Sequence, residues 1–386
     1  MATGSQSPSL AARNIQQASA RIGGDVLRLR TVLELAGVNR YPVGRLSGRE
    51  GRTVKYRWLG NSGLRVSILS LGTSPFGSRM GSVSGVDQET ASRIVARAID
   101  GGVNLFDTAD EYSRGQAEEI LGKALGKKRD DVLIATKAGY RAGDDLNDFG
   151  SSRRHLTLAL EGSLRRLQRD YVDLFYVHVF DPHTSAYDLL VTLDCFVKAG
   201  KVRAVAASNY PAWRLVEALN TAGQSGFPRF CAYQGLWNIL SRDVELEIVP
   251  ACLANGLGFI AWAPLAGGWL TGKYSRNGPL PCGARLTDPA DDDLHLDREM
   301  GYQVVDTLTE IARVRGATVS QIALSWQFAR PWLCSSVAGA RTVEQLEENL
   351  AAELLELSNE ELARIDHVAP VQRVWPHWFI DEYGED

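Results

Sequence analysis

The 386-residue sequence has no apolar run of the ~18 residues that a membrane-spanning helix needs, so we expect no membrane partner. Basic residues are not in excess: 46 Asp and Glu outnumber 42 Lys and Arg, and the net charge of −4 argues against nucleic acid as the main partner. The five cysteines are widely spaced and odd in number. This is typical of reduced thiols in a reducing compartment such as the cytoplasm, and not of a disulfide framework or a zinc site. The histidines have no metal-ligand spacing and the H-E-x-x-H motif is missing, so we expect no metal.

The first 55 residues differ in composition from the rest. Residues 1–20 are rich in Ser, Ala and Gln and contain no acidic residue, and arginines punctuate the stretch that follows. We therefore divide the chain into an N-terminal extension, residues 1–55, and one globular domain, residues 56–386. The extension is interpreted as a disordered tail with one short helix over residues 26–35, as the result of a translation start site assigned too far upstream, or as an organelle-targeting segment.

From residue 56 onwards, apolar runs alternate with segments of helical periodicity. The predicted strands cover residues 66–71, 103–106, 132–136, 172–177, 202–207, 230–233, 259–261 and 335–337. The predicted helices cover residues 88–100, 117–125, 152–167, 187–198, 212–219, 244–254 and 343–352, and two more begin at Arg298 and Ser320. The strands are continuously apolar, as strands covered on both faces must be, and eight such units predict a (β/α)8 TIM barrel. An open doubly wound sheet is the alternative, but the turn GTSPFGS at residues 72–78 is not the G-x-G-x-x-G that it would need to bind a dinucleotide.

Polar side chains close three consecutive predicted strands. Asp107 ends the second strand in LFDTADEY, Tyr112 follows in the same motif, Lys137 ends the third strand and His178 ends the fourth. Each residue alone is more often structural, as a helix cap or a satisfied core group. In a barrel, however, the carboxyl ends of the strands face one cavity, so these four titratable groups should converge there.

The residue types favour proton transfer to an oxygen. A phenol with a pKa near ~10 is a poor donor at neutral pH, and we expect the ammonium of Lys137 to lower the pKa of Tyr112 toward the working range. Asp107 is the natural partner that would keep a buried Lys137 charged. His178 can donate a hydrogen bond to a carbonyl oxygen and so orient it. A hydride source is missing, because no side chain supplies one.

In this order and at these strand ends, Asp107, Tyr112, Lys137 and His178 resemble the catalytic tetrad of the aldo-keto reductase superfamily. The resemblance extends from about Tyr56 to the C-terminal helix and includes the motifs GGVNLFDTADEY, YVDLFYVH, GKVRAVAASNY, APLAGGWLTGKY and GARTVEQLEENL. The long loop after the seventh strand looks like the branch that contains potassium channel β subunits and many bacterial and fungal reductases. This resemblance implies an NADPH-dependent reductase of an aldehyde, ketone or keto-sugar carbonyl, in which Tyr112 is the general acid.

The resemblance also implies a set of NADPH contacts. Ser208, Asn209 and Gln234 would hold the nicotinamide carboxamide, and Trp262 would stack on its ring. The pyrophosphate strap would contain Ala263, Pro264, Leu265, Gly267 and Leu270, with Lys273 nearby. The adenosine pocket would contain Gly339, Arg341, Gln345, Glu348 and Asn349, and we count Gly72 and Thr73 at the first strand end among the cofactor contacts. Arg341 precedes the helix over residues 343–352, and a guanidinium at a helix N-terminus suits a 2′-phosphate, which favours NADP over NAD.

Two functions remain open at this point. The complete tetrad favours an active enzyme with a small-molecule carbonyl substrate, whereas the N-terminal extension is the one feature that favours an NADPH-binding regulatory subunit like the channel β subunits. A homo-oligomer is compatible with either function. Specificity in a barrel depends on loops, here residues 76–86, 140–150 and 210–213 and the C-terminal VWPHWF, and these loops do not select among aromatic and hydroxylated substrates.

Overall fold

The computed structural model describes residues 44–47, 53–80, 83–276, 278, 281, 284, 286 and 294–384. These residues belong to one compact unit, Val43–Asp386. Most of the predicted N-terminal extension lies outside the described residues, as do the helix predicted over residues 26–35 and Cys282. The parts of the extension that are described form β1 (Gly44–Ser47) and the start of β2 (Thr53–Trp58).

Eight parallel strands close into a barrel, which confirms the predicted fold. In chain order they are β4 (Leu69–Gly72), β7 (Leu105–Asp107), β8 (Leu133–Ala138), β9 (Val172–Val177), β10 (Val202–Ser208), β11 (Ala232–Leu236), β12 (Gly258–Trp262) and β13 (Leu333–Gly339). Each strand pairs in parallel with the next along the chain, and β13 pairs with β4 to complete the ring.

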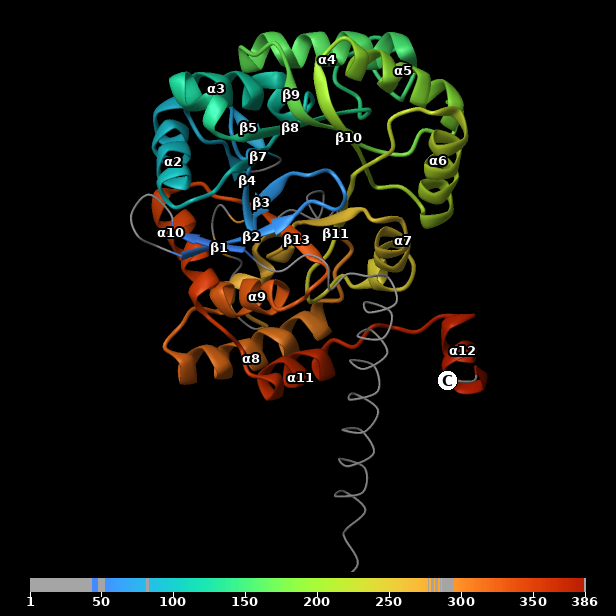
Figure 1. Ribbon diagram of the computed structural model, residues 1–386. Helices are drawn as coiled ribbons and strands as arrows, with labels where there is room; N and C mark the ends of the chain where they lie inside the picture. Colours follow the sequence, from blue (N-terminus) through green and yellow to red (C-terminus); the bar gives the residue numbers. More distant parts are fainter. Residues whose placement is uncertain are drawn as a thin grey trace, which may run out of the picture. The chain divides into compact units, whose positions relative to one another are not determined.

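The helices that follow the strands run around the outside of the barrel (Figure 1). They are α2 (Gln88–Asp100), α3 (Gln116–Leu125), α4 (Arg153–Leu167), α5 (Ala186–Lys198), α6 (Ala212–Ser225), α7 (Ile248–Asn255), α8 (Arg298–Arg315), α9 (Val319–Phe328), α10 (Val343–Ala351), α11 (Asn359–Val368) and α12 (His377–Tyr383). The helix predicted over residues 244–254 is divided into a 3₁₀ turn, Asp243–Glu245, and α7. Pro250 explains this division, because it lacks an N–H and is tolerated only in the first turn of a helix. Among the described helices, none is long and apolar enough to cross a membrane.

The first predicted strand, residues 66–71, is two strands. β3 (Arg65–Ser67) pairs antiparallel with β2, and β2 also pairs antiparallel with β1, whereas β4 enters the barrel. A second short antiparallel pair, β5 (Arg79–Met80) and β6 (Val83–Ser84), lies within the loop that follows β4. These antiparallel elements were not predicted.

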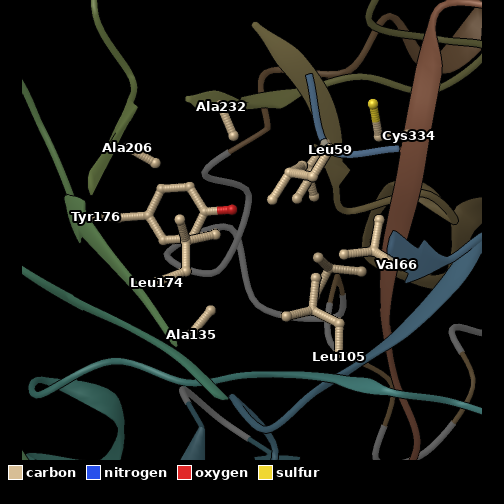
Figure 2. Close-up of a cluster of buried hydrophobic side chains, with 11 residues drawn as sticks. Leu59, Val66, Leu105, Ala135, Leu174, Tyr176, Ala206, Ala232 and Cys334 are labelled. Atoms are coloured by element: carbon tan, nitrogen blue, oxygen red, sulfur yellow. The ribbon is translucent and has the colours of Figure 1, made fainter. Parts of the chain in front are cut away.

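An apolar cluster fills the interior of the barrel. Leu59 and Val66, from the β2–β3 hairpin, pack with inward side chains of the barrel strands such as Leu105, Leu174 and Tyr176 (Figure 2). All five side chains are at most 1% exposed. Because side chains alternate between the two faces of a strand, the residues two positions after these core side chains also point into the barrel, nearer its carboxyl end.

Candidate active site

The sequence-predicted site residues occupy those inward positions. Asp107 follows Leu105 by two residues on β7, and Lys137 follows Ala135 on β8. His178 comes two residues after Tyr176, directly beyond the end of β9. On β10, β11 and β12, the residues two positions after core residues of the barrel are also site residues. They are Ser208 after Ala206, Gln234 after Ala232 and Trp262 after Ile260. The period-2 alternation of neighbouring parallel strands therefore brings polar groups from six strands to one end of the barrel.

Lys137 is the centre of the site. Its Nζ donates to Asp107 Oδ1 and, at 2.8 Å, to the carbonyl oxygen of Thr108, and it lies 3.5 Å from the hydroxyl oxygen of Tyr112. The Lys137 side chain is fully buried and that of Asp107 is 3% exposed. Burial lowers the pKa of Lys137, but Asp107 and Tyr112 outweigh it, so the pKa lies above its usual value. Lys137 is therefore a buried ammonium ion at neutral pH, in contact with the phenol.

Asp107 is held by groups from the adjacent strand β4 and from β11 on the opposite side of the barrel. Its second carboxylate oxygen accepts a 2.8 Å hydrogen bond from Gln234 Nε2. Its backbone carbonyl accepts from the backbone N–H and the hydroxyl of Thr73 at 2.9 and 3.1 Å, and Gly72 is its partner in the β4–β7 register. The predicted contacts Gly72, Thr73 and Gln234 are thus next to the tetrad.

Tyr112 opens the 3₁₀ helix Tyr112–Gly115, which is held by the hydrogen bond from Ser113 Oγ to the Phe76 carbonyl at 2.8 Å. Burial raises the pKa of Tyr112 to about 12, and Lys137 only partly opposes this effect. Lys137 lowers the pKa of Tyr112, as expected, but burial outweighs this effect, so the expectation that the pKa reaches the working range is wrong. The cost of placing a phenolate in a buried site exceeds the attraction of the one ammonium beside it.

His178 completes the tetrad. Its ring lies 6.0 Å from that of Tyr112 between centroids, and the ring of Tyr140 packs edge-on against it at 4.5 Å. Burial, together with the charge of Lys137, holds the pKa of His178 well below its usual value, so the imidazole is neutral. Its Nδ1 lies 4.0 Å from Oε1 of Glu111. Sequence reasoning missed Glu111 and Tyr140, although Glu111 stands in DTADEY directly before Tyr112.

Asn209 connects His178 to the ends of β10 and β12. Its backbone is left-handed, with φ of 54°, a conformation that Asn tolerates better than most residues. Its Nδ2 donates to the His178 carbonyl at 3.0 Å and to Ser208 Oγ at 3.1 Å, and its Oδ1 accepts from Trp262 Nε1 at 3.2 Å. Ser208, Asn209 and Trp262 therefore form one hydrogen-bonded group beside the tetrad.

The segment after β12 is a tight loop. Ala263 and Gly267 both have left-handed backbones, and Leu270 is buried within the 3₁₀ segment Ala266–Thr271. The carbonyls of Ala263 and Pro264 accept from Asn238 and Gln327 at 3.0 and 2.9 Å. Leu265 is the residue before the 3₁₀ segment, and its carbonyl accepts from the backbone N–H of Gly268. Lys273, which ends the loop, has a lowered pKa because it is partly buried and close to Arg341.

Arg341 follows Gly339, the last residue of β13, and precedes α10. Its backbone N–H donates to Gln345 Oε1 at 2.9 Å. Asn349 is buried on the same helix, whereas Glu348 accepts a 2.6 Å hydrogen bond from the α9 cap residue Thr318. Two cations, Lys273 and Arg341, thus approach each other where a helix begins, and such a site suits the phosphates of a dinucleotide. Among the described residues, no group of His, Cys, Asp and Glu could hold a metal ion.

An acid–base cluster at the carboxyl end of a (β/α)8 barrel is the arrangement of an enzyme active site. The profile of the aldo/keto reductase family matches residues 68–370, and the chain belongs to that family, whose members generally use NAD(P)H. It is 35% identical to an uncharacterized oxidoreductase of Bacillus subtilis, over 82% of this chain and 96% of that protein. It is also 35% identical to a norsolorinic acid reductase of Emericella nidulans, over 83% of each protein, and 35% identical to a probable voltage-gated potassium channel subunit beta of Oryza sativa, over 78% of this chain and 91% of that protein.

Proposed function

We propose that this protein is an NADPH-dependent reductase that converts an aldehyde, ketone or keto-sugar carbonyl to the alcohol, with Tyr112 as the general acid. The observation that carries the proposal is the ammonium of Lys137, which is buried between the carboxylate of Asp107 and the hydroxyl of Tyr112. A carbonyl oxygen that receives a hydride on its carbon becomes an alkoxide and needs a proton. A phenol beside a buried, fixed positive charge is suited to give it one.

Each residue of the tetrad has a distinct role in this proposal. Tyr112 donates its O–H to the developing alkoxide, and Lys137 stabilises the phenolate that remains. Asp107 keeps Lys137 charged and in place. The neutral imidazole of His178 donates a hydrogen bond to the carbonyl oxygen and orients it. NADPH, when bound, supplies the hydride.

The cofactor assignment rests on two groups of side chains. The hydrogen-bonded group of Ser208, Asn209 and Trp262 lies beside His178 and would hold and stack the nicotinamide, with Gln234 as a further amide contact. Lys273 and Arg341 would meet the phosphates. Because Arg341 stands at the start of α10, it suits a 2′-phosphate, and this supports NADPH over NADH.

The proposed substrate is a small-molecule carbonyl compound. Large apolar side chains are exposed near the carboxyl end of the barrel: Phe149, in the loop after β8, is 44% exposed, and Trp213, in the first turn of α6, is 62% exposed. On the C-terminal segment, Trp375 and Trp378 are 71% and 45% exposed. Such side chains suit an aromatic substrate, whereas the polar residues of the same loops suit a hydroxylated one, so both classes belong in the first screen.

The test is single-turnover oxidation of bound NADPH by the full-length protein with aromatic aldehydes and keto sugars. We expect at least one class to react, and Tyr112→Phe to slow hydride transfer by roughly 10²–10⁴-fold, the usual contribution of a general acid, while NADPH affinity is nearly unchanged. Tyr187→Phe, which removes the hydroxyl of an exposed tyrosine on α5, is the matched control and should react like the natural protein. Tight NADPH binding without turnover of any carbonyl would overturn the proposal. Loss of NADPH affinity in Tyr112→Phe would show instead that the phenol has a structural role.

A further inference from the structure

Glu111 carries a carboxyl group in the proposed site and has no role in the tetrad mechanism proposed above. It precedes Tyr112 directly, and its Oε1 lies 4.0 Å from Nδ1 of His178. The Glu111 side chain is 28% exposed, whereas that of His178 is 8% exposed, so Glu111 is the more accessible of the two side chains. Nδ1 of His178 is buried and has no hydrogen-bond partner among the described residues. A small rotation of Glu111 would supply that partner.

The partner that Nδ1 receives decides what the other ring nitrogen can do. A neutral imidazole carries one proton, so one nitrogen is a donor and the other an acceptor. If Nδ1 accepts a hydrogen bond from a protonated carboxyl, the ring proton is on Nε2. If Nδ1 donates to an ionised carboxylate, Nε2 is left with a lone pair. The first tautomer can donate to a carbonyl oxygen through Nε2, and the second cannot.

We propose that Glu111 is a positioning residue that sets the tautomer of His178 and thereby makes carbonyl reduction depend on pH. Protonated Glu111 donates to Nδ1 and holds the Nε2–H tautomer, which favours reduction. When Glu111 ionises, its proton passes to water, and the single imidazole proton moves from Nε2 to Nδ1 by exchange with water. The Nε2 lone pair then accepts from an alcohol, which favours the reverse reaction. This inference rests on the proposed function for its effect on rate, but the tautomer itself does not depend on that function.

The surroundings of Glu111 place this change within the working pH range. Burial raises the pKa of Glu111 to about 7, and the attraction of Lys137 on β8 opposes that effect. On its own segment Glu111 has two titratable neighbours. Asp110 is buried, and its burial, with the charges of Glu118 and Glu111, raises its pKa well above the usual value, while Arg166 partly opposes this effect. Tyr112, on the other side, is neutral, because its pKa is about 12. His178, beyond the end of β9, is neutral as well, so Glu111 changes charge near pH 7 while Tyr112 and His178 do not.

The first readout is the tautomer, measured by ¹⁵N NMR of the histidine rings in the full-length protein without substrate, with His178 assigned by a His178→Asn variant. We expect the Nε2–H tautomer at pH 6 and the Nδ1–H tautomer at pH 8.5. In Glu111→Gln, whose amide N–H can donate to Nδ1 at any pH, the Nε2–H tautomer should persist at both. Glu119→Gln, the same charge change at an exposed position on α3, should behave like the natural protein. An unchanged His178 tautomer between pH 6 and 8.5 in the natural protein would overturn the inference.

The second readout is the single-turnover rate of carbonyl reduction. A positioned donor to a developing alkoxide contributes on the order of 10²-fold, and with a Glu111 pKa of about 7 the rate should fall roughly 20-fold between pH 6 and 8.5 in the natural protein and in Glu119→Gln. In Glu111→Gln this fall should be lost and the rate at pH 8.5 should exceed that of the natural protein. A fall of equal size in Glu111→Gln would contradict the inference. If no carbonyl reacts at any pH, the proposed function fails, while the NMR result still decides the role of Glu111.

Discussion

Replacement of Asp107 by asparagine separates the charge of this residue from its shape. In the natural site Lys137 donates to one carboxylate oxygen and Gln234 donates to the other at 2.8 Å. An amide has only one oxygen, so in Asp107→Asn one of the two donors faces an N–H₂ group. The ammonium of Lys137, which is fully buried, also loses its one carboxylate partner in the described site. Breaking a buried ion pair in this way costs about 3–5 kcal/mol of unfolding free energy.

The pH dependence of this loss has a defined sign. In the natural protein the pKa of Lys137 lies above that of an unfolded lysine, so its contribution to stability is complete below ~10.5 and is lost only above it. In Asp107→Asn burial acts without the carboxylate and the pKa of Lys137 falls below the unfolded value. The unfolded chain then binds more protons than the folded one, so the stability of the variant rises with pH. Each pH unit above the new pKa removes at most ~1.4 kcal/mol of the deficit.

Urea denaturation at pH 7 and pH 9.5 measures both effects. We expect the deficit of Asp107→Asn relative to the natural protein to be several kcal/mol at pH 7 and smaller at pH 9.5. The control is Asp194→Asn, which breaks an i,i+4 pair with Lys198, whose side chain is 76% exposed, and it should have a much smaller effect at either pH because exposed ion pairs contribute little. A deficit in Asp107→Asn as small as that of the control, or one that does not change with pH, would refute the assignment of Lys137 as a buried ammonium held by Asp107.

Two further substitutions test the cofactor assignment and the core. Arg341→Ala should weaken NADPH binding by roughly 10- to 100-fold, which is the contribution of charge-assisted hydrogen bonds, and should leave NADH binding nearly unchanged. Calorimetric titrations measure both affinities. Equal weakening of both would contradict the proposal that Arg341 binds the 2′-phosphate. Trp237→Ala should lower the unfolding free energy by about 3–5 kcal/mol in urea denaturation, because Trp237 is fully buried and stacks on Trp326 with 5.0 Å between ring centroids. Trp213→Ala, at a 62% exposed position, should change it by less than ~0.5 kcal/mol, and a similar change in both would contradict the packing argument.

Much of the barrel could be predicted because local signals agree with the fold. The bounds predicted for α2 and β9 are those of the structure. For α2 the signals are explicit: the Asp87 carboxylate accepts from the N–H of Thr90 at 2.8 Å, and Gly101 ends the helix. One available signal was missed. Ser358 and Glu361 form a capping box, a pattern visible in the sequence, and it begins the unpredicted α11.

The elements that could not be predicted depend on long-range pairing. Residues 65–72, RVSILSLG, mix apolar side chains with Ser67 and Ser70, and no local signal shows that β3 pairs with β2 while β4 joins the barrel. The grouping of the tetrad followed from topology alone, because the carboxyl ends of parallel strands meet. The direction of the Tyr112 pKa shift did not follow, because it depends on how completely the surrounding chain buries the phenol, and the sequence carries no measure of that burial.

The raised pKa of Tyr112 changes how its role should be understood. With a pKa of about 12 the phenol is protonated throughout the range in which the protein would be assayed, so it is always ready to donate and does not need to be acidified before the reaction. Lys137 acts later, when the phenolate forms and its negative charge would otherwise be buried without a counter-ion. Tyr112 therefore cannot cause an inflection near pH 7 in the rate of reduction, and Glu111, with a pKa of about 7, can. If that inflection is found and persists in Glu111→Gln, Glu111 does not cause it and the phenol of Tyr112 is the group that titrates. The conclusion that burial dominates the Tyr112 pKa is then wrong.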